Sequence, residues 1–299
     1  MTDSLFRGVM PAITTPFASD GSVDLGRLEA HCRRMVEEGC SGVVPLGSLG
    51  EGATLDASER AAVLEASVRA CGAVPVIAGV AATSTKAACE MARLAAACGC
   101  RGLMVLPAML YPGSPREEIA HARAVIGATD LPCMLYNNPA AYGTDFTPGM
   151  ISELAGSSPN LVAVKESSGD CRRVTAILAE HSGRLDVCVG LDDMVVEGFD
   201  AGARGWVAGL VNALPVESIR LWRLLEQGER EEALALYRWF LPLLRLDTGS
   251  DFVQWIKLAQ EVCGTGTSLV RPPRLPFEGA ARERALEKIR GVLATRRPS

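Results

Sequence analysis

Residues 161–170 of the chain read LVAVKESSGD, a run of small apolar residues that ends in a lysine, an acid and a Ser-Ser-Gly turn. A lysine in this position is unusual, because burying an ammonium group costs several kcal/mol unless the charge is paired or neutralised. Lysine is also rare in this chain, since only four of the 30 Lys and Arg residues are lysines. We therefore interpret 161–166 as a buried strand with Lys165 at its carboxyl end.

Apolar runs of the same kind recur along the chain, each followed by turn residues. The eight expected strands are 8–14, 42–47, 74–80, 102–107, 132–137, 161–166, 186–190 and 205–210. Amphipathic segments, expected as helices, lie between them at 24–38, 56–71, 84–98, 115–128, 147–157, 171–182 and 193–202. Near-continuous apolar strands that alternate with helices indicate parallel strands buried on both faces.

Eight such units predict an α/β protein with the (β/α)8 TIM barrel fold, and the length of 299 residues leaves room for more. Helical periodicity continues after the eighth strand. We assign 1–228 to the barrel and 229–299 to a C-terminal helical extension. The alternative is an open doubly wound sheet, which is disfavoured because no G-x-G-x-x-G follows the first strand.

Composition argues against several classes of protein. The net charge of −5, without any block of Lys and Arg in the body of the chain, argues against a nucleic-acid partner. No apolar stretch approaches ~18 residues, and the first residues do not resemble a signal peptide, so we expect no membrane partner and a cytoplasmic location.

The ten cysteines form no C-x-x-C, and His31, His121 and His181 all lie in expected helices. We therefore predict buried free thiols and no metal site.

The carboxyl ends of the strands build the active site in this fold. Side chains alternate along a strand, so Ala163 and Lys165 share one face while Glu166 faces the other way, as a structural partner. If Lys165 points into the barrel mouth, desolvation lowers the pKa of its amine and supplies the uncharged nitrogen that carbonyl addition needs. The alternative is a lysine that closes the strand end by pairing with Glu51 or Asp192.

Two other strand ends carry groups that suit this chemistry. Tyr136 lies on the preceding strand, and because neighbouring strands are about 4.8 Å apart its phenol can reach Lys165 and move protons. Ser48, in the turn Gly47–Gly50, faces this pair across the barrel, where its hydroxyl and the N–H groups of the turn suit a carboxylate. The alternatives are a packing tyrosine and an ordinary glycine-rich turn.

Together these residues resemble the family of dihydrodipicolinate synthase and N-acetylneuraminate lyase, the class I aldolases that form a Schiff base. The resemblance covers nearly the whole chain and is carried by GVMPAITTPF (8–17), GSLGE (47–51), YNNP (136–139), VAVKESSGD (162–170), GLDD (190–193) and GLVNALP (209–215). It implies that Lys165 forms an imine with a 2-oxo acid, that Tyr136 moves protons and that the Ser48 turn holds the carboxylate. It also implies a homo-oligomer, tetramer or dimer, and no cofactor, because the imine itself is the electron sink.

Three departures from the family pattern bear on the substrate. Leu49 stands where a second hydroxyl is usual, which makes the pocket more apolar. Ala141 stands where the lysine-biosynthetic synthases carry an arginine for the second substrate's carboxylate, which argues against dihydrodipicolinate synthase. Tyr111, in PAMLY (107–111), fits the family's phenol that crosses a subunit interface only with a shift of one residue.

The patterns YNNPAAYGTDFTP (136–148) and LRLDTGSDFVQWIKLA (244–259) resemble catabolic branches of the family. Among these is the deaminase of 1-pyrroline-4-hydroxy-2-carboxylate, which releases ammonia and 2-oxoglutarate semialdehyde, and we rank this activity first. The alternatives are an aldolase or dehydratase of a 2-keto-3-deoxy sugar acid, and a barrel that binds a small carboxylate without turnover.

Small and acidic residues at the remaining strand ends complete the expected site. Gly190 and Gly209 are interpreted as positions where the backbone comes close to the lysine. Asp192 and Asp193 precede an expected helix and are interpreted as its caps.

Overall fold

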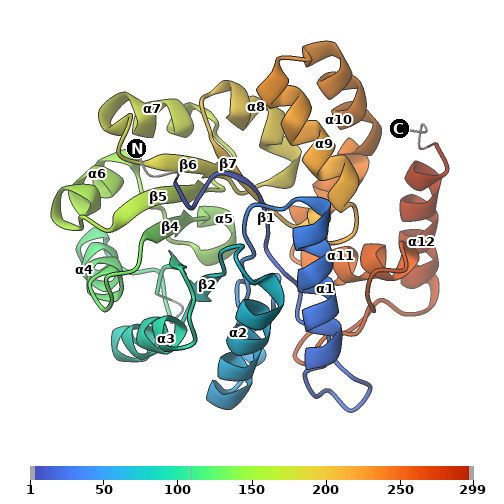
Figure 1. Cartoon of the computed structure of the whole chain (residues 1–299), viewed down its shortest axis with the longest axis horizontal. Helices are drawn as coiled ribbons and strands as arrows, with labels where there is room; N and C mark the ends of the chain where they lie inside the picture. The colour runs from blue at the N-terminus through green and yellow to red at the C-terminus, as the bar shows by residue number, and fades with distance from the viewer. Residues whose placement is uncertain (1–3, 109, 296–299) are drawn as a thin grey trace.

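A curled parallel sheet forms the centre of the computed structural model, which describes residues 4–108 and 110–295 (Figure 1). Its sheet order is β1-β7-β6-β5-β4-β3-β2, so consecutive strands lie side by side and β1 lies next to β7. The strands are β1 (Gly8–Pro11), β2 (Ile77–Val80), β3 (Gly102–Val105), β4 (Cys133–Asn137), β5 (Leu161–Glu166), β6 (Asp186–Val189) and β7 (Gly205–Ala208). Nearly every residue of these strands is buried, as expected for parallel strands covered on both faces.

The segment expected as a strand at 42–47 pairs differently from the other seven. Val44 makes a single parallel bridge to Ala12, just after β1, and Val43 makes one to Val76, just before β2. Pro45 has no N–H to donate, so a longer ladder cannot form here. The segment nevertheless joins the two edges of the sheet and closes the ring, which makes the fold a (β/α)8 barrel.

Helices surround the ring where the amphipathic segments predicted them (Figure 1). Two of them begin with a capping box, in which the Asp56 or Ser114 side chain and a glutamate three residues later satisfy each other's backbone N–H groups. The helices of the ring are α1 (Leu25–Glu38), α2 (Ala57–Cys71), α3 (Thr85–Ala97), α4 (Pro115–Ile126), α6 (Pro148–Ser157), α7 (Arg172–His181), α8 (Val195–Asp200) and α9 (Pro215–Gln227).

Several short helical turns were not expected from the sequence. They are η1 (Gly52–Thr54), α5 (Pro139–Tyr142), η2 (Asp192–Met194), η3 (Leu210–Asn212) and η4 (Arg245–Asp247). The expected helix at 193–202 is divided between η2 and α8. Three of the turns, α5, η2 and η3, directly follow β4, β6 and β7, whereas η1 follows the Gly47–Gly50 turn and η4 lies in the C-terminal part of the chain.

Three helices follow α9 and lie together on one side of the ring, beside α1 (Figure 1). They are α10 (Arg230–Leu244), α11 (Phe252–Val262) and α12 (Gly279–Leu293). Helix α11 is the most deeply buried of the three, because Val253, Ile256 and Leu258 are fully covered. This C-terminal part also buries Lys257, whose charge requires a partner inside the protein.

All ten cysteines are free thiols, and six of them are buried: Cys32, Cys40, Cys71, Cys100, Cys133 and Cys188. Burial raises the pKa of most of these thiols, for example that of Cys133 to about 12, so they remain protonated. Within residues 4–108 and 110–295, no group of three or more His, Cys, Asp or Glu side chains is arranged to hold a metal ion. In the same part of the chain, no helix is both long and apolar enough to cross a bilayer.

Candidate active site

Lys165 is buried at the carboxyl end of β5, with only 5% of its surface exposed. Gly190, at the end of the neighbouring β6, makes room for it. A Cβ atom at position 190 would lie 2.7 Å from Lys165 Cε and would also overlap Ser167 Oγ. Real Cβ atoms do not approach other atoms so closely, so glycine is required here for the lysine stem to pass.

Burial is the main influence on the Lys165 amine, and it lowers the pKa below its ordinary value. Electrostatic interaction with Asp247, and to a smaller extent with Tyr142 and Asp192, opposes this effect. Lys165 makes no direct ion pair or hydrogen bond within the described part of the chain, and neither of the partners considered from the sequence is available. Glu51 binds another lysine, and Asp192 accepts backbone N–H groups. The amine is therefore an unpaired nitrogen with an increased uncharged fraction.

Tyr136 packs directly against Lys165. The two residues are opposite each other in the register of β4 and β5, and Lys165 Nζ lies 4.2 Å from the centre of the Tyr136 ring. The Tyr136 hydroxyl accepts a hydrogen bond of 3.1 Å from Asn138 Nδ2. Burial raises the pKa of the phenol, so it carries a proton that it can deliver to a reacting group.

Tyr142 is a second phenol that the sequence analysis missed. It ends the short helix α5, its hydroxyl is hydrogen-bonded to Ser48 Oγ, and its ring meets that of Tyr136 edge-on at 5.6 Å. Asn138 caps α5 by accepting the N–H of Ala141, and one helical turn then returns Tyr142 toward the barrel. An Asn-Pro helix start followed by a tyrosine three residues after the proline was the signal that could have identified it.

The turn Gly47–Gly50 is held close to the ends of β1 and β2. A Cβ at Gly50 would lie 2.8 Å from the Ile13 carbonyl oxygen, and one at Gly79 would lie 2.8 Å from the Gly47 nitrogen. These contacts explain the glycines without any reference to a ligand. They also leave Ser48 as the partly exposed polar side chain of the turn, with Leu49 buried behind it.

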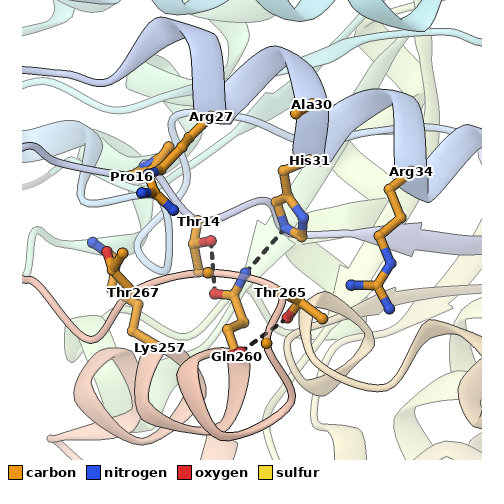
Figure 2. A pocket seen from close by; sticks show the side chains of 12 residues that line it. Thr14, Pro16, Arg27, Ala30, His31, Arg34, Lys257, Gln260, Thr265 and Thr267 are labelled. Atoms are coloured by element: carbon orange, nitrogen blue, oxygen red, sulfur yellow. Dashed lines mark hydrogen bonds between the residues drawn. The ribbon is translucent and has the colours of Figure 1, made fainter.

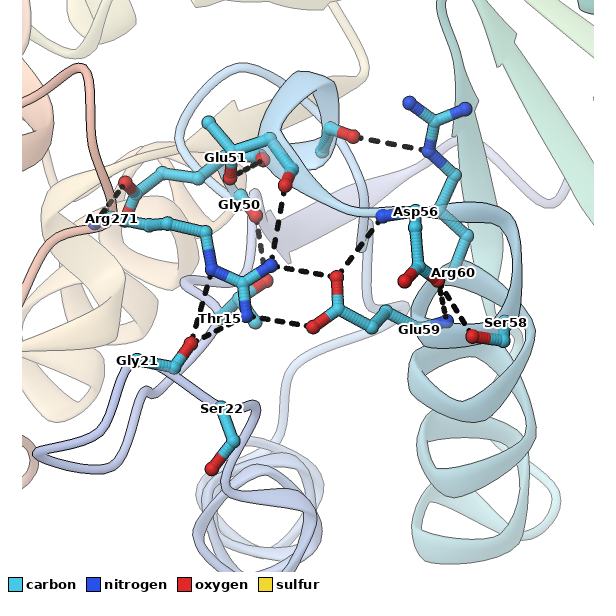
Figure 3. Close-up of polar contacts among 12 residues, drawn as sticks. Thr15, Gly21, Ser22, Gly50, Glu51, Asp56, Ser58, Glu59, Arg60 and Arg271 are labelled. Atoms are coloured by element: carbon cyan, nitrogen blue, oxygen red, sulfur yellow. Dashed lines mark hydrogen bonds and ion pairs between the residues drawn. The ribbon is translucent and has the colours of Figure 1, made fainter.

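Glu51 follows this turn and anchors it to the C-terminal part of the chain (Figure 3). Its buried carboxylate accepts a hydrogen bond of 2.6 Å from Lys257 Nζ and one of 3.0 Å from the Arg271 backbone N–H. The Arg271 guanidinium in turn binds both carboxylate oxygens of Glu59 and the Gly21 carbonyl. The C-terminal helices therefore help to set the position of the Ser48 turn.

Asp247 reaches the same region from η4, and the sequence analysis missed it as well. Its carboxylate occupies the space above Gly209, where a Cβ would collide with it. Burial and repulsion from Asp192 raise the Asp247 pKa well above its ordinary value. No hydrogen bond or direct ion pair engages this carboxylate in the described part of the chain. No local pattern could have indicated it, because it lies 82 positions after the lysine in a segment of helical periodicity.

Other residues singled out from the sequence lie differently. Tyr111 is 53% exposed, and its hydroxyl donates to Glu117 Oε1 at 3.3 Å. Ala141 is exposed on α5. Asp192 is not a helix cap: its carboxylate accepts the Gly209 N–H at 3.0 Å, together with the Leu210 N–H and the Trp206 indole N–H. It ties β6 to the end of β7, because a buried carboxylate requires several donors.

A ring of eight parallel segments with a buried, unpaired lysine and two phenols at one end is typical of one class of protein, the barrel enzymes that use a lysine amine as nucleophile. Comparison with known proteins identifies the group within this class. The chain belongs to the dihydrodipicolinate synthetase family, whose family model matches residues 5–291. Members of this family are lyases.

Relatives and solved structures resemble the chain over nearly its whole length. The 4-hydroxy-tetrahydrodipicolinate synthases of Haloarcula marismortui and Sorangium cellulosum are 34% and 33% identical to it, over 99% and 98% of this chain and 95% and 98% of theirs. The crystal structure of YagE, a prophage protein of this family from E. coli K12 in complex with pyruvate, is 26% identical with a TM-score of 0.91. That match covers 97% of this chain and 99% of YagE.

Proposed function

We propose that the protein is a Schiff-base-forming lyase that acts on a small 2-oxo acid or cyclic imino acid through Lys165. The observation that carries this proposal is the buried, unpaired Lys165 amine against the Tyr136 ring. The Ser48 turn, with Tyr142 bound to its hydroxyl, would hold the substrate carboxylate. Tyr136 would donate and accept protons as the imine forms and breaks down.

The substrate that we rank first is 1-pyrroline-4-hydroxy-2-carboxylate. The Lys165 amine adds to the C=N carbon, and cleavage of the ring C–N bond leaves the substrate joined to the lysine as an imine. Loss of a C3 proton gives an enamine, which expels the C4 hydroxyl as water. Tautomerisation and hydrolysis then release ammonia at C5 and 2-oxoglutarate semialdehyde at C2, with a net consumption of one water. This series of reaction steps requires a group that donates a proton to the C4 hydroxyl as it leaves.

Dihydrodipicolinate synthase is the second candidate. It is favoured by the names of the relatives, which are 4-hydroxy-tetrahydrodipicolinate synthases at 30% to 34% identity. The residue at position 141 favours the deaminase, because an exposed alanine cannot bind the carboxylate of a second substrate as the family's arginine does. An aldolase or dehydratase of a 2-keto-3-deoxy sugar acid uses the same lysine chemistry and belongs in the same test.

Two measurements test the proposal in sequence. Reduction with borohydride in the presence of pyruvate is expected to add a stable mass increment at Lys165, and a barrel that only binds carboxylates would gain none. A panel of the cyclic imino acid, pyruvate with aspartate semialdehyde, and 2-keto-3-deoxy acids then separates the activities. Ammonia released from the cyclic imino acid supports the deaminase; turnover of another member alone contradicts it.

Asp247 is the proton donor that we assign to loss of the C4 hydroxyl. A raised pKa keeps its carboxyl protonated to higher pH than usual, and an acid works only below its pKa. Replacement of Asp247 by asparagine is expected to lower kcat by roughly 10²-fold or more. In a plot of kcat against pH, the decrease of kcat at high pH should also disappear. Mass labelling of Lys165 by pyruvate and borohydride should persist, because the amine is retained.

The matched control is Asp193→Asn, because Asp193 adjoins Asp192 in the chain and its carboxylate lies 3.7 Å from Arg245 Nε. This variant should keep the kcat of the parent, and its kcat should still decrease at high pH. If the kcat of Asp247→Asn still decreases at high pH as the parent's does, another group supplies the proton.

We also infer a homo-oligomer, tetramer or dimer, that acts in the cytoplasm. Leu110 and Tyr111 are 67% and 53% exposed in the loop after β3, and adjacent large apolar side chains on a surface suit a subunit contact. Ten free thiols suit a reducing compartment. Light scattering is expected to give a mass of at least two chains, and replacing both Leu110 and Tyr111 by serine should lower it. A parent mass of one chain, 31.6 kDa, would contradict the assembly.

A further inference from the structure

A cavity lies between α1 and the C-terminal part of the chain, and its lining includes none of Lys165, Tyr136, Tyr142 and Ser48 (Figure 2). Its volume is about 310 Å³. One wall is the face of α1 that carries Arg27, His31 and Arg34. The opposite walls come from Gln260 of α11 and from the loop that follows it. The full lining is Thr14, Pro16, Arg27, Ala30, His31, Arg34, Lys257, Gln260, Gly264, Thr265, Gly266 and Thr267.

Every charged side chain in this lining is basic. Lys257 is already neutralised by Glu51, at 2.6 Å. Arg27 uses Nε to bind Asp24 at 3.1 Å, and Arg34 Nε only approaches Glu38, at 3.9 Å. The terminal nitrogens of both guanidinium groups are therefore left to bind an anion, in the bidentate geometry that suits a carboxylate.

The spacing of the two arginines indicates how many charges the ligand carries. Arg27 and Arg34 are seven residues apart, two turns of α1, which separates their Cα atoms by roughly 10.5 Å along the helix axis. Positions seven apart lie on the same helix face, so both side chains border the same cavity. If the guanidinium groups keep this separation, one carboxylate contacts only one of them, whereas a short chain with a carboxylate at each end contacts both.

The walls between the arginines are polar and fixed in place. Gln260 accepts a hydrogen bond of 2.9 Å from Thr14 Oγ1, and His31 Nε2 lies 2.9 Å from Asn212 Oδ1. His31 Nδ1 and Thr267 Oγ1 are buried without a hydrogen-bond partner in the described chain. Buried polar atoms without partners are costly, so a polar ligand or ordered water is favoured here over an apolar one.

We propose that this cavity binds a small dicarboxylate, with one carboxylate on Arg27 and the other on Arg34. Thr265, Thr267 and Gln260 also line the cavity, and of these the Thr267 hydroxyl has no hydrogen-bond partner in the described chain. This site does not depend on imine formation, because Lys165 and the Ser48 turn take no part in it.

Isothermal titration calorimetry with glutarate, at constant ionic strength, tests the proposal. Glutarate is expected to bind the parent protein, and the double variant Arg27→Gln/Arg34→Gln should bind it at least about tenfold more weakly, because both charge-assisted contacts are lost. Butyrate, which has one carboxylate, should bind the parent protein more weakly than glutarate. Unfolding temperatures establish that the variants are folded.

Two controls separate this site from others. Arg93→Gln/Arg284→Gln removes the same charge from exposed positions on α3 and α12, and it should bind glutarate like the parent. Lys165→Ala should also bind it like the parent. The proposal is overturned by absence of glutarate binding to the parent, by unchanged binding in Arg27→Gln/Arg34→Gln, by equal loss in Arg93→Gln/Arg284→Gln, or by loss in Lys165→Ala.

Discussion

Replacement of Lys165 by alanine is expected to lower kcat/KM by on the order of 10⁴-fold or more, because the nucleophile of a covalent mechanism cannot be replaced by binding energy alone. Arginine at this position should not restore turnover, because a guanidinium group stays protonated and does not add to a carbonyl or imine carbon. Steady-state kinetics on the substrate that the panel identifies would measure both effects. The mass increment with pyruvate and borohydride should disappear with the activity.

Lys86→Ala is the matched control, because the Lys86 side chain is 87% exposed on α3, where it approaches Glu90 at 3.8 Å. It should retain both turnover and the mass increment of the parent. Denaturation curves for Lys165→Ala distinguish loss of the amine from loss of the fold. A Lys165→Ala enzyme that is folded and turns over its substrate at the parent rate would exclude imine chemistry at this residue.

Lys257→Met is expected to lower the free energy of unfolding by about 3–5 kcal/mol, because it leaves the Glu51 carboxylate buried without its cation. Glu51 and Lys257 are both about 1% exposed, so water cannot replace the missing partner. Arg274, at 3.8 Å from Glu51, compensates only in part. Because Glu51 anchors the Ser48 turn, KM should rise more than kcat falls. Urea denaturation and steady-state kinetics measure the two effects.

The double variant Glu51→Gln/Lys257→Met tests whether this loss of stability comes from the unpaired buried charge. It removes the buried charge together with its partner, so it should recover part of the stability that Lys257→Met loses. An exposed pair such as Arg123 and Glu153 serves as the control, and Arg123→Met should change the free energy of unfolding by less than about 1 kcal/mol. Equal denaturation midpoints for Lys257→Met and the parent would show that the buried pair does not stabilise the fold.

The alternation of apolar strands with amphipathic helices predicted the barrel, because each of those patterns is local to one segment. The same reasoning predicted that Tyr136 and Lys165 would be neighbours, since adjacent parallel strands place their carboxyl ends side by side. It failed at 42–47, where the apolar run is present but Pro45 prevents a regular ladder. Asp192 was misassigned as a helix cap, because nothing near it in the sequence shows that β7 supplies its donors.

The sequence by itself determined the ring of strands, the helices around it and the strand that presents Lys165, because periodicity within ten to fifteen residues is enough to specify each of them. Only the tertiary structure decided which groups surround the amine. Tyr142 meets Ser48 across 94 positions, and Lys257 meets Glu51 across 206. The first contact depends on how α5 folds over the end of β4, and the second on how α11 packs against the barrel mouth. That packing is set by the combined shape of many side chains, so no single stretch of sequence records it.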